Sequence, residues 1–264
     1  MTTNHQNHSD NSASSGASST KTLLYIIVGT LGFGILFIVG SAVLHEQDIE
    51  SRRRAIAVAG GKSELVRVVP GWLKSIAGED FHSFLDQTMI SKITMTGEKI
   101  GDEQVKALAA VSTVPTLKEL DLEASNITSE GLASVVLLKE LRILNLSQTD
   151  ITDVSALAAM PNMDALNISF SKVRDANLSP ISTLPALKFL NAGGLILTDV
   201  GVAEIGKCTA LESLSIRACI LSPTGLQALH GLKSLKQLNL ADATYDPADL
   251  AALRAALPNC NINT

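Results

Sequence analysis

The sequence predicts an α/β solenoid, a horseshoe of about seven stacked repeats with a parallel sheet on the concave side and helices on the convex side, preceded by one transmembrane helix. Three observations predict it: one motif recurs along the chain, the leucines within the motif have a characteristic spacing, and an apolar segment precedes the first copy. The motif occurs seven times at spacings of 22 to 27 residues, and its leucines lie at intervals of three and two. That spacing fits neither a helix nor a long alternating strand. A long uncharged apolar stretch precedes the first copy.

The motif is clearest in LRILNLSQTDITD, residues 141–153, where Leu144, Leu146 and Ile151 hold the fourth, sixth and eleventh positions. The frame LxxLxLxxxxI, repeated about every 20 to 29 residues, is the signature of a leucine-rich repeat. We expect the fourth and sixth positions to point from a short strand into a core that neighbouring copies close. The copies begin at Ile90, Leu117, Leu141, Met163, Leu187, Leu211 and Leu235.

A helix is expected to follow each strand on the convex side. In the fourth copy Pro180 predicts a short or irregular helix. Aspartates one residue after the cap position, such as Asp175 and Asp199, are expected to stabilise the helix dipole rather than to bind a cation. The predicted N-cap residues, which carry short oxygen-bearing side chains, are Thr128, Thr152, Thr198, Ser222 and Asp246.

The chain divides into four predicted segments. Residues 1–22 are rich in Ser, Asn, Thr and His without apolar periodicity, which predicts a disordered polar tail. Residues 23–44 form the transmembrane helix, and residues 45–89 form a juxtamembrane segment and an N-terminal cap. Residues 90–264 form the leucine-rich-repeat domain with its C-terminal cap. A solenoid needs such caps because its first and last layers have no neighbour.

The transmembrane prediction depends on 22 residues without a charge. At a rise of about 1.5 Å per residue they span about 33 Å, enough for a hydrocarbon core of about 30 Å. A cleaved signal peptide is the alternative, although this stretch exceeds the usual apolar length of about 7 to 15 residues. The sequence thus predicts a single-pass membrane protein. Arg52, Arg53 and Arg54 follow the helix whereas only Lys21 precedes it, so the positive-inside rule favours a cytoplasmic repeat domain.

Composition limits the chemistry. The net charge of −5 provides no basic footprint for nucleic acid. Three scattered cysteines, Cys208, Cys219 and Cys260, form neither a disulfide framework nor a metal motif, and Cys208 stands where other copies carry a buried aliphatic residue. The histidines cannot be assembled into a catalytic set. We therefore expect no catalytic residues, no bound metal and no cofactor.

The chain resembles bacterial membrane-anchored leucine-rich-repeat proteins with repeats of the ribonuclease-inhibitor-like subtype. The single anchor, the cap segment GGKSELV…PGWLKSIAGEDF, the turns TDITDVSAL and LTDVGVAEI and the ending LPNCNI carry the resemblance, which spans roughly residues 55 to 262. It implies a curved scaffold for protein interaction and nominates no catalytic residue.

The predicted function is a non-enzymatic, membrane-anchored interaction scaffold that binds a protein or peptide on the concave face of the repeats. The alternative is a structural or assembly protein of the cell envelope that acts through homo-oligomerisation. Its sequence support is the pair Thr30 and Gly34, which would let two transmembrane helices approach closely.

The candidate binding residues come from the positions that face the concave side, the third, fifth, seventh and eighth of each copy. The fifth position forms a polar row, and large apolar groups are expected to stand exposed beside it in the middle of the array. Alternatively, two of these apolar groups, Phe170 and Phe189, merely cover one another and the small Gly193 and Gly194 beside them. The candidate partner-binding residues are Ile143, Asn145, Asn167, Phe170, Phe189 and Asn191.

Overall fold

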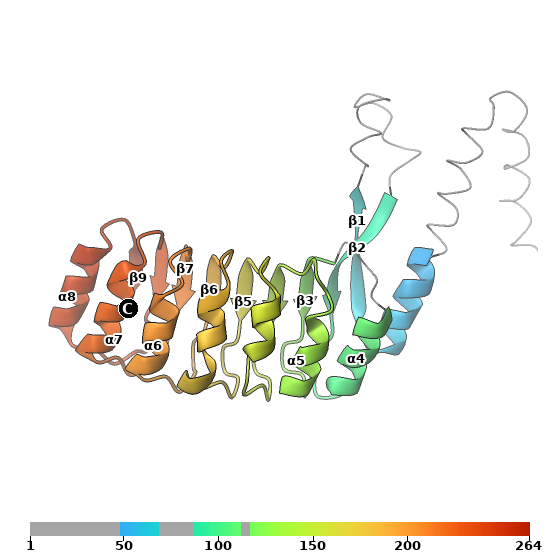
Figure 1. The fold of residues 1–264 in the computed structure, drawn as a ribbon, viewed down its shortest axis with the longest axis horizontal. Coiled ribbons are helices and arrows are strands. Elements are labelled where there is room, and N and C mark those ends of the chain that lie inside the picture. Colours follow the sequence, from blue (N-terminus) through green and yellow to red (C-terminus); the bar gives the residue numbers. More distant parts are fainter. Residues whose placement is uncertain (1–47, 69–86, 112–116) are drawn as a thin grey trace, which may run out of the picture. The chain divides into compact units, whose positions relative to one another are not determined.

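The computed structural model describes residues 48–68, 87–111 and 117–264 of the protein. The predicted polar tail, the predicted transmembrane helix over residues 23–44 and the middle of the predicted N-terminal cap lie outside these residues. In the described part, strands run across one side of a stack of repeats and helices lie on the other (Figure 1). This confirms the predicted leucine-rich-repeat solenoid.

The sheet of the described residues has nine strands in sequence order, so each repeat adds one strand beside the previous one. From β2 onward all neighbours are parallel, and each three-residue strand pairs through the third, fourth and fifth positions of its copy. The strands are β2 (Gln87–Thr94), β3 (Glu119–Asp121), β4 (Ile143–Asn145), β5 (Ala165–Asn167), β6 (Phe189–Asn191), β7 (Ser213–Ser215), β8 (Gln237–Asn239) and β9 (Asn261–Asn263).

The first strand departs from the predicted parallel sheet. β1 (Lys62–Val68) pairs with β2 antiparallel, because it comes from the cap and not from a repeat. A helix over residues 48–58 precedes it, and Ile56 from this helix is buried in the core cluster. Gly60, with φ of 85°, makes the turn between helix and strand, a conformation that favours glycine. The described part of the cap thus covers the first repeat with one helix and one strand.

The core is one continuous row of aliphatic layers. The fourth-position leucines pair across the parallel strands, as Leu144 does with Leu166 and Leu166 with Leu190. The sixth positions are buried beneath them in every copy, and so are the eleventh positions except in the last copy, where Tyr245 is partly buried. The predicted inward positions are confirmed. Cys208 is also buried in this cluster, as expected for a thiol in place of an aliphatic side chain.

A left-handed residue ends every strand segment. The eighth position has positive φ in all seven copies of the described repeats: Gly97, Ala124, Gln148, Phe170, Gly194, Ala218 and Asp242, with φ between 53° and 93°. The amide of this residue donates to the seventh-position carbonyl of the next copy, as Ala124 does to Ser147 at 2.9 Å and Gln148 to Ser169 at 2.9 Å. The same bend therefore follows the same three-residue strand in each copy.

The convex side carries α-helices in only some copies. The third copy has 22 residues, too few for a full helix, and the fourth contains Pro180; both form 3₁₀ turns instead. The prediction for the fourth copy is confirmed, whereas the third was not anticipated. The elements are α4 (Asp102–Val111), α5 (Ser129–Val135), η1 (Ser155–Ala159), η2 (Asp175–Asn177), η3 (Ser179–Thr183), α6 (Asp199–Gly206), α7 (Pro223–Ala228), η4 (Leu229–Gly231) and α8 (Pro247–Ala256).

Four of the five predicted N-caps are confirmed, because Thr128, Thr198, Ser222 and Asp246 each accept a hydrogen bond from the amide two residues on. Thr152 does not cap a helix. In its copy Val154 precedes η1, and no side chain caps this turn.

Asp102 and Asp199 stand in the first turn of their own helices, where the sequence placed them. Together with Asp175 they also bind across repeats, which the sequence did not predict. Asp102 Oδ1 accepts from the amides of Thr128 at 2.8 Å and Gly131 at 3.1 Å, and its Oδ2 accepts from Thr128 Oγ1 at 2.6 Å. Asp175 binds the amide and hydroxyl of Thr198 in the same way, and Asp199 those of Ser222. We call each such contact a carboxylate staple, because it joins one copy to the N-cap of the next.

Each staple requires a glycine in the following helix. A methyl group on Gly131, Gly201 or Gly225 would collide with the stapling carboxylate of Asp102, Asp175 or Asp199. The helix of the last copy, α8, differs on both counts. The copy before it carries Pro223 where a stapling aspartate would stand, and α8 carries Asp249 where the glycine would stand. Staple and glycine thus occur together within the chain.

The predicted membrane-spanning part of the fold is corrected. Within the described ranges no helix is long and apolar enough to cross a membrane. The α-helices of the repeats have between 6 and 10 residues, about 15 Å at most, whereas a hydrocarbon core is about 30 Å thick. The structure supports a leucine-rich-repeat solenoid, and the predictions of a transmembrane helix over residues 23–44 and of a single-pass membrane protein are corrected, because no described helix could span a membrane.

Leu144→Ala tests the inward positions. Leu144 is 1% exposed, so its truncation removes burial and leaves a cavity, and we expect the free energy of unfolding to fall by about 2 to 5 kcal/mol. Leu137→Ala is the matched control, because Leu137 is 60% exposed and should cost far less. Urea denaturation of both variants checks this, and equal losses would refute the assignment of the fourth position to the core.

A double-mutant cycle on Gly225 and Asp199 tests the staple. Alanine normally stabilises a helix by up to about 1 kcal/mol over glycine, but a methyl on Gly225 would lie 2.5 Å from Asp199 Oδ1. We expect Gly225→Ala to lower the free energy of unfolding by about 1 to 3 kcal/mol through loss of the charged hydrogen bonds. In an Asp199→Ala background the same change should be neutral or stabilising. A cost that is identical in both backgrounds would show that the staple does not explain the glycine.

Candidate functional site

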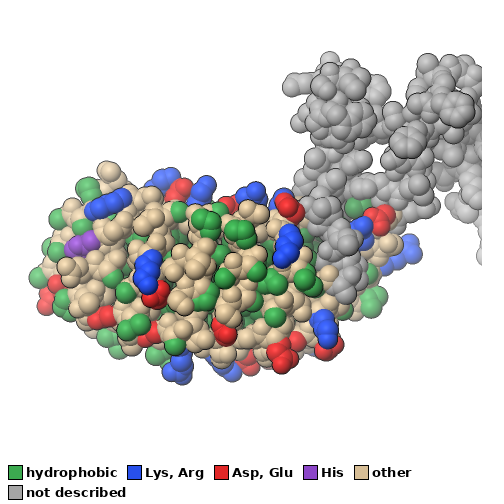
Figure 2. Space-filling view, in the orientation of Figure 1, with side chains coloured by type: hydrophobic (Ala, Val, Ile, Leu, Met, Phe, Trp, Pro, Cys, Tyr) green, Lys and Arg blue, Asp and Glu red, His purple; other side chains and the backbone are tan. Residues whose placement is uncertain are grey.

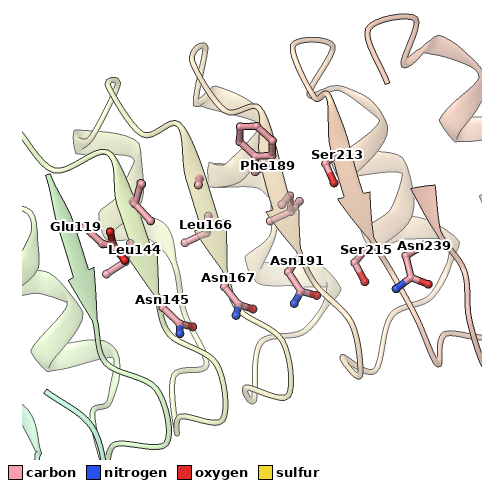
Figure 3. A pocket seen from close by; sticks show the side chains of 13 residues that line it. Glu119, Leu144, Asn145, Leu166, Asn167, Phe189, Asn191, Ser213, Ser215 and Asn239 are labelled. Atoms are coloured by element: carbon pink, nitrogen blue, oxygen red, sulfur yellow. The ribbon is translucent and has the colours of Figure 1, made fainter. Parts of the chain in front are cut away.

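A shallow hollow of about 480 Å³ lies on the sheet side, over the middle strands β4 to β6. Its rows of side chains come from the third and fifth positions of successive copies, which the parallel register places side by side (Figure 3). Ile143, Asn145, Asn167, Phe189 and Asn191 all line it, so the structure brings together five of the six residues selected from the sequence.

The third positions of β4, β5 and β6 form an apolar row in which the middle side chain is shorter than its two neighbours. Ile143 pairs with Ala165, and Ala165 pairs with Phe189 on the next strand. Ile143 is 40% exposed and Phe189 is 49% exposed, whereas the methyl group of Ala165 rises far less from the sheet. Beyond the apolar row the same position is polar, with Glu119 on one side and Ser213 on the other. We call the space above Ala165, between Ile143 and Phe189, the notch.

The fifth positions form a row of asparagines whose orientation is fixed by the backbone. Asn167 Oδ1 accepts from the amide of Ser169 at 3.1 Å and from its hydroxyl at 2.7 Å. Asn191 Oδ1 likewise accepts from the amide of Gly193 at 3.1 Å. With the oxygen held in this way, the NH₂ group of each side chain is turned outward as a donor. Figure 3 shows the three central asparagines in one row across the strands.

The NH₂ groups of this row differ in what they can still bind. Asn145 Nδ2 already donates to Asp121 Oδ1 at 2.9 Å. For Asn167 and Asn191 the described residues offer Nδ2 no acceptor within hydrogen-bond range. Two unused donors therefore lie next to each other on β5 and β6, beside the notch.

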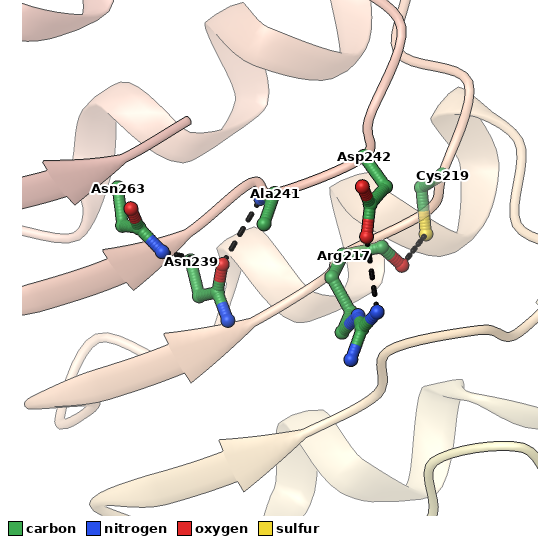
Figure 4. A network of polar contacts seen from close by, with 6 residues as sticks. All are labelled: Arg217, Cys219, Asn239, Ala241, Asp242 and Asn263. Carbon is green, nitrogen blue, oxygen red and sulfur yellow. Dashed lines mark hydrogen bonds and ion pairs between the residues drawn. The ribbon is translucent and has the colours of Figure 1, made fainter.

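The polar row continues toward the C-terminal end with a different pattern. Asn239 Oδ1 accepts from the amide of Ala241 at 3.0 Å and from Asn263 Nδ2 at 3.3 Å (Figure 4). Close by, Arg217 and Asp242 form an ion pair at 3.0 Å. The same fifth-position geometry thus extends to the last strand, but the apolar third-position row does not.

Charges surround the hollow in compensated pairs. Lys92 binds Glu119 at 2.9 Å, and this hydrogen bond and charge raise the pKa of Lys92. Along the rim Arg142 pairs with Asp164 at 3.2 Å, and on the helix side acidic and basic side chains are interspersed (Figure 2). Exposed pairs of this kind contribute little to stability. They leave the middle of the hollow without a net charge of either sign.

Phe170, the sixth residue selected from the sequence, lies apart from the hollow. It occupies the left-handed eighth position with φ of 56°, unusual for a bulky side chain, and it is 52% exposed. Its ring packs on Gly194, where an added methyl group would collide with it. The alternative that Phe170 covers this glycine therefore describes the contact, and Phe170 does not line the hollow.

Ala165 and Ser213 line the hollow but were not predicted from the sequence, and Ser215 and Asn239 belong to the predicted polar row but were not among the selected residues. The signal was present, because these residues hold the third or fifth position of their copies. Small side chains attract no attention in a search for anchors, although Ala165 gives the hollow its depth.

The buried thiols are placed for packing. Burial raises the pKa of both Cys208 and Cys219 to about 11, with a further contribution from Glu204 and Asp175 respectively. Among the described residues no group of three or more His, Cys, Asp or Glu side chains could hold a metal ion. Neither thiol is near the hollow.

Comparison with known proteins identifies the class. A family model described as Leucine Rich repeat matches residues 115–136. With the in-register repeats this shows that the chain has the leucine-rich-repeat fold.

Among solved structures, internalin C2 of Listeria monocytogenes is similar with a TM-score of 0.51 and 19% identity, over 72% of this chain and 90% of that chain. A leucine-rich-repeat protein of Leptospira interrogans has 23% identity and a TM-score of 0.48, over 61% of this chain and 39% of that one. A search of curated protein sequences found no match. The likeness to internalin C2 shows the fold and no particular activity.

Thiol labelling tests the placement of the cysteines. At about pH 8.5, where an ordinary thiol is half ionised, iodoacetamide should modify Cys260 first, because it is only partly buried. Cys208 and Cys219 should react only after denaturation, since burial both blocks access and keeps them protonated. Peptide mass spectrometry reads the order, and equally fast labelling of all three in the native protein would contradict the buried positions.

Proposed function

We propose that this protein is a non-catalytic interaction scaffold that binds a protein partner on the sheet side of its repeats, over β4 to β6. The observation that carries the proposal is the hollow in which half-exposed Ile143 and Phe189 share one surface with the free NH₂ groups of Asn167 and Asn191. Large apolar groups held out by a rigid scaffold are the usual anchors of protein interfaces.

The way in which the surface is built supports this proposal. Each repeat contributes one residue to every row, so the rows form an extended surface that a compact pocket for a small molecule would not need. The hollow is open, and its polar groups are spread along the sheet and do not converge on one point. This geometry suits a partner that lies across several strands.

The alternative of an assembly protein depended on Thr30 and Gly34, which lie outside the described residues. We therefore propose the interaction scaffold alone.

Phe189→Arg tests the binding surface. The side chain is half-exposed, so the substitution should leave the fold intact, while a charge in the centre of the hollow should weaken association by at least about 2 kcal/mol, the scale of an interface hot spot. Partners are first captured from a lysate of the source organism and purified, and their affinity for the full chain is then measured by calorimetry.

Leu137→Arg provides the control, because Leu137 is a comparably exposed apolar residue just after α5 on the convex side. It should bind as the unchanged protein does. If Phe189→Arg keeps full affinity for a verified partner and an unchanged circular-dichroism melt, the partner binds elsewhere.

A further inference from the structure

The geometry points to the chemical class of the partner: we propose that the hollow takes an extended peptide segment that places one large apolar side chain in the notch and its backbone carbonyls on Asn167 and Asn191. This inference rests on the proposed function and deepens it. It derives from the short middle side chain of the apolar third-position row and from the fixed orientation of the asparagine row.

The notch has the width of one side chain. Adjacent strands lie about 4.8 Å apart, so β4 and β6 are separated by roughly 10 Å, with β5 as the floor. Ile143 and Phe189 form the two walls, and Ala165, which pairs with both, leaves the space between them open. A Leu, Ile, Met or Phe side chain fits between these walls and would be covered by apolar groups on both sides.

The donors beside the notch select for carbonyl oxygens. Because the Oδ1 atoms of Asn167 and Asn191 are held by backbone amides, neither side chain can turn its oxygen outward without breaking a hydrogen bond. Asn167 and Asn191 therefore offer donors to a ligand, whereas the acceptors of the hollow come from other strands, such as Ser215 on β7. Backbone carbonyls of a ligand would accept from these two donors, whereas sugar hydroxyls would also need acceptors beside them and a lipid chain would leave the NH₂ groups unpaired.

The position of the two rows fits a chain that lies across the strands. The third and fifth positions are two residues apart, which is about 6.6 Å along a strand. A peptide that runs between the rows can turn one side chain into the notch and its carbonyls toward the asparagines. Two charged pairs border the hollow, Glu119 with Lys92 and Arg142 with Asp164, so these four side chains do not select for a charged residue in the peptide.

The test fills the notch without altering its walls. Random linear peptides displayed on phage are selected on the full chain, and the affinity of an enriched peptide is measured for the unchanged protein, Ala165→Leu and Gln237→Leu. Gln237 is the matched control, because it is exposed at the same strand position on β8 and does not line the hollow. Circular-dichroism melts verify that both variants fold.

We expect enriched peptides to share one large apolar residue, and Ala165→Leu to weaken binding roughly tenfold or more, the scale for loss of a side-chain pocket. Gln237→Leu should bind nearly as the unchanged protein does. Replacing the shared apolar residue of the peptide by alanine should abolish the difference between the unchanged protein and Ala165→Leu, since the notch then has nothing to exclude.

The outcomes separate this inference from the proposed function. If Phe189→Arg weakens peptide binding but Ala165→Leu does not, the sheet side binds the peptide and the notch inference is overturned. Equal damage from Ala165→Leu and Gln237→Leu, or selected peptides without a common apolar residue, would also overturn it. If neither Phe189→Arg nor Ala165→Leu changes the affinity, the proposed function fails as well, because binding then occurs elsewhere on the chain.

Discussion

The constant register of the parallel strands is the constraint on which the rest of the structure depends. Every copy pairs with the next at the same three positions, so residues of equal position stand in straight rows. One row is the buried leucine row that holds the copies together, and the two beside it face the hollow. A shift by one residue would turn the leucines outward and bury the asparagines. Core and candidate binding surface are therefore set by one pairing pattern.

Two further devices hold that register where the strands are too short to hold it alone. On the sheet side, the left-handed eighth residue bends the chain and donates to the next copy. On the helix side, the carboxylate staples tie the cap of each joined copy to the copy before it. The asparagines belong to the same system, because their oxygens bind the amide two residues on, and their donors face outward as a result. The outward-facing donors of the candidate site thus result from the hydrogen bonds that the asparagine oxygens accept from the backbone amides of the turns.

The repeat frame was predictable because burial follows directly from spacing: Leu144, Leu146 and Ile151 are buried as their positions require. The hydroxyl caps were predictable for the same local reason. The partner of Asp175 in the next repeat was not predictable. A carboxylate one residue past an N-cap can stabilise its own helix or bind the N-cap of the next repeat, and only the distance between stacked repeats decides between the two. The 3₁₀ turn of the third copy depends on its shorter length, a signal that a motif alignment does not weigh.

The predicted transmembrane helix had only composition behind it, and in the described residues no helix supports it. Five site residues came together because they share two rows, whereas Phe170 holds the eighth position, and its ring turns onto Gly194.

The most direct test of the account observes the asparagine side chains during binding. The full chain is titrated with a selected peptide while the side-chain NH₂ resonances are followed in an amide nitrogen–proton correlation NMR spectrum. The account predicts that the signals of Asn167 and Asn191 shift strongly and exchange more slowly with water, while the signal of Asn145, already bound to Asp121, moves less. Resonances of Asn167 and Asn191 that stay unchanged at saturating peptide would contradict it, because the partner would then not occupy the hollow.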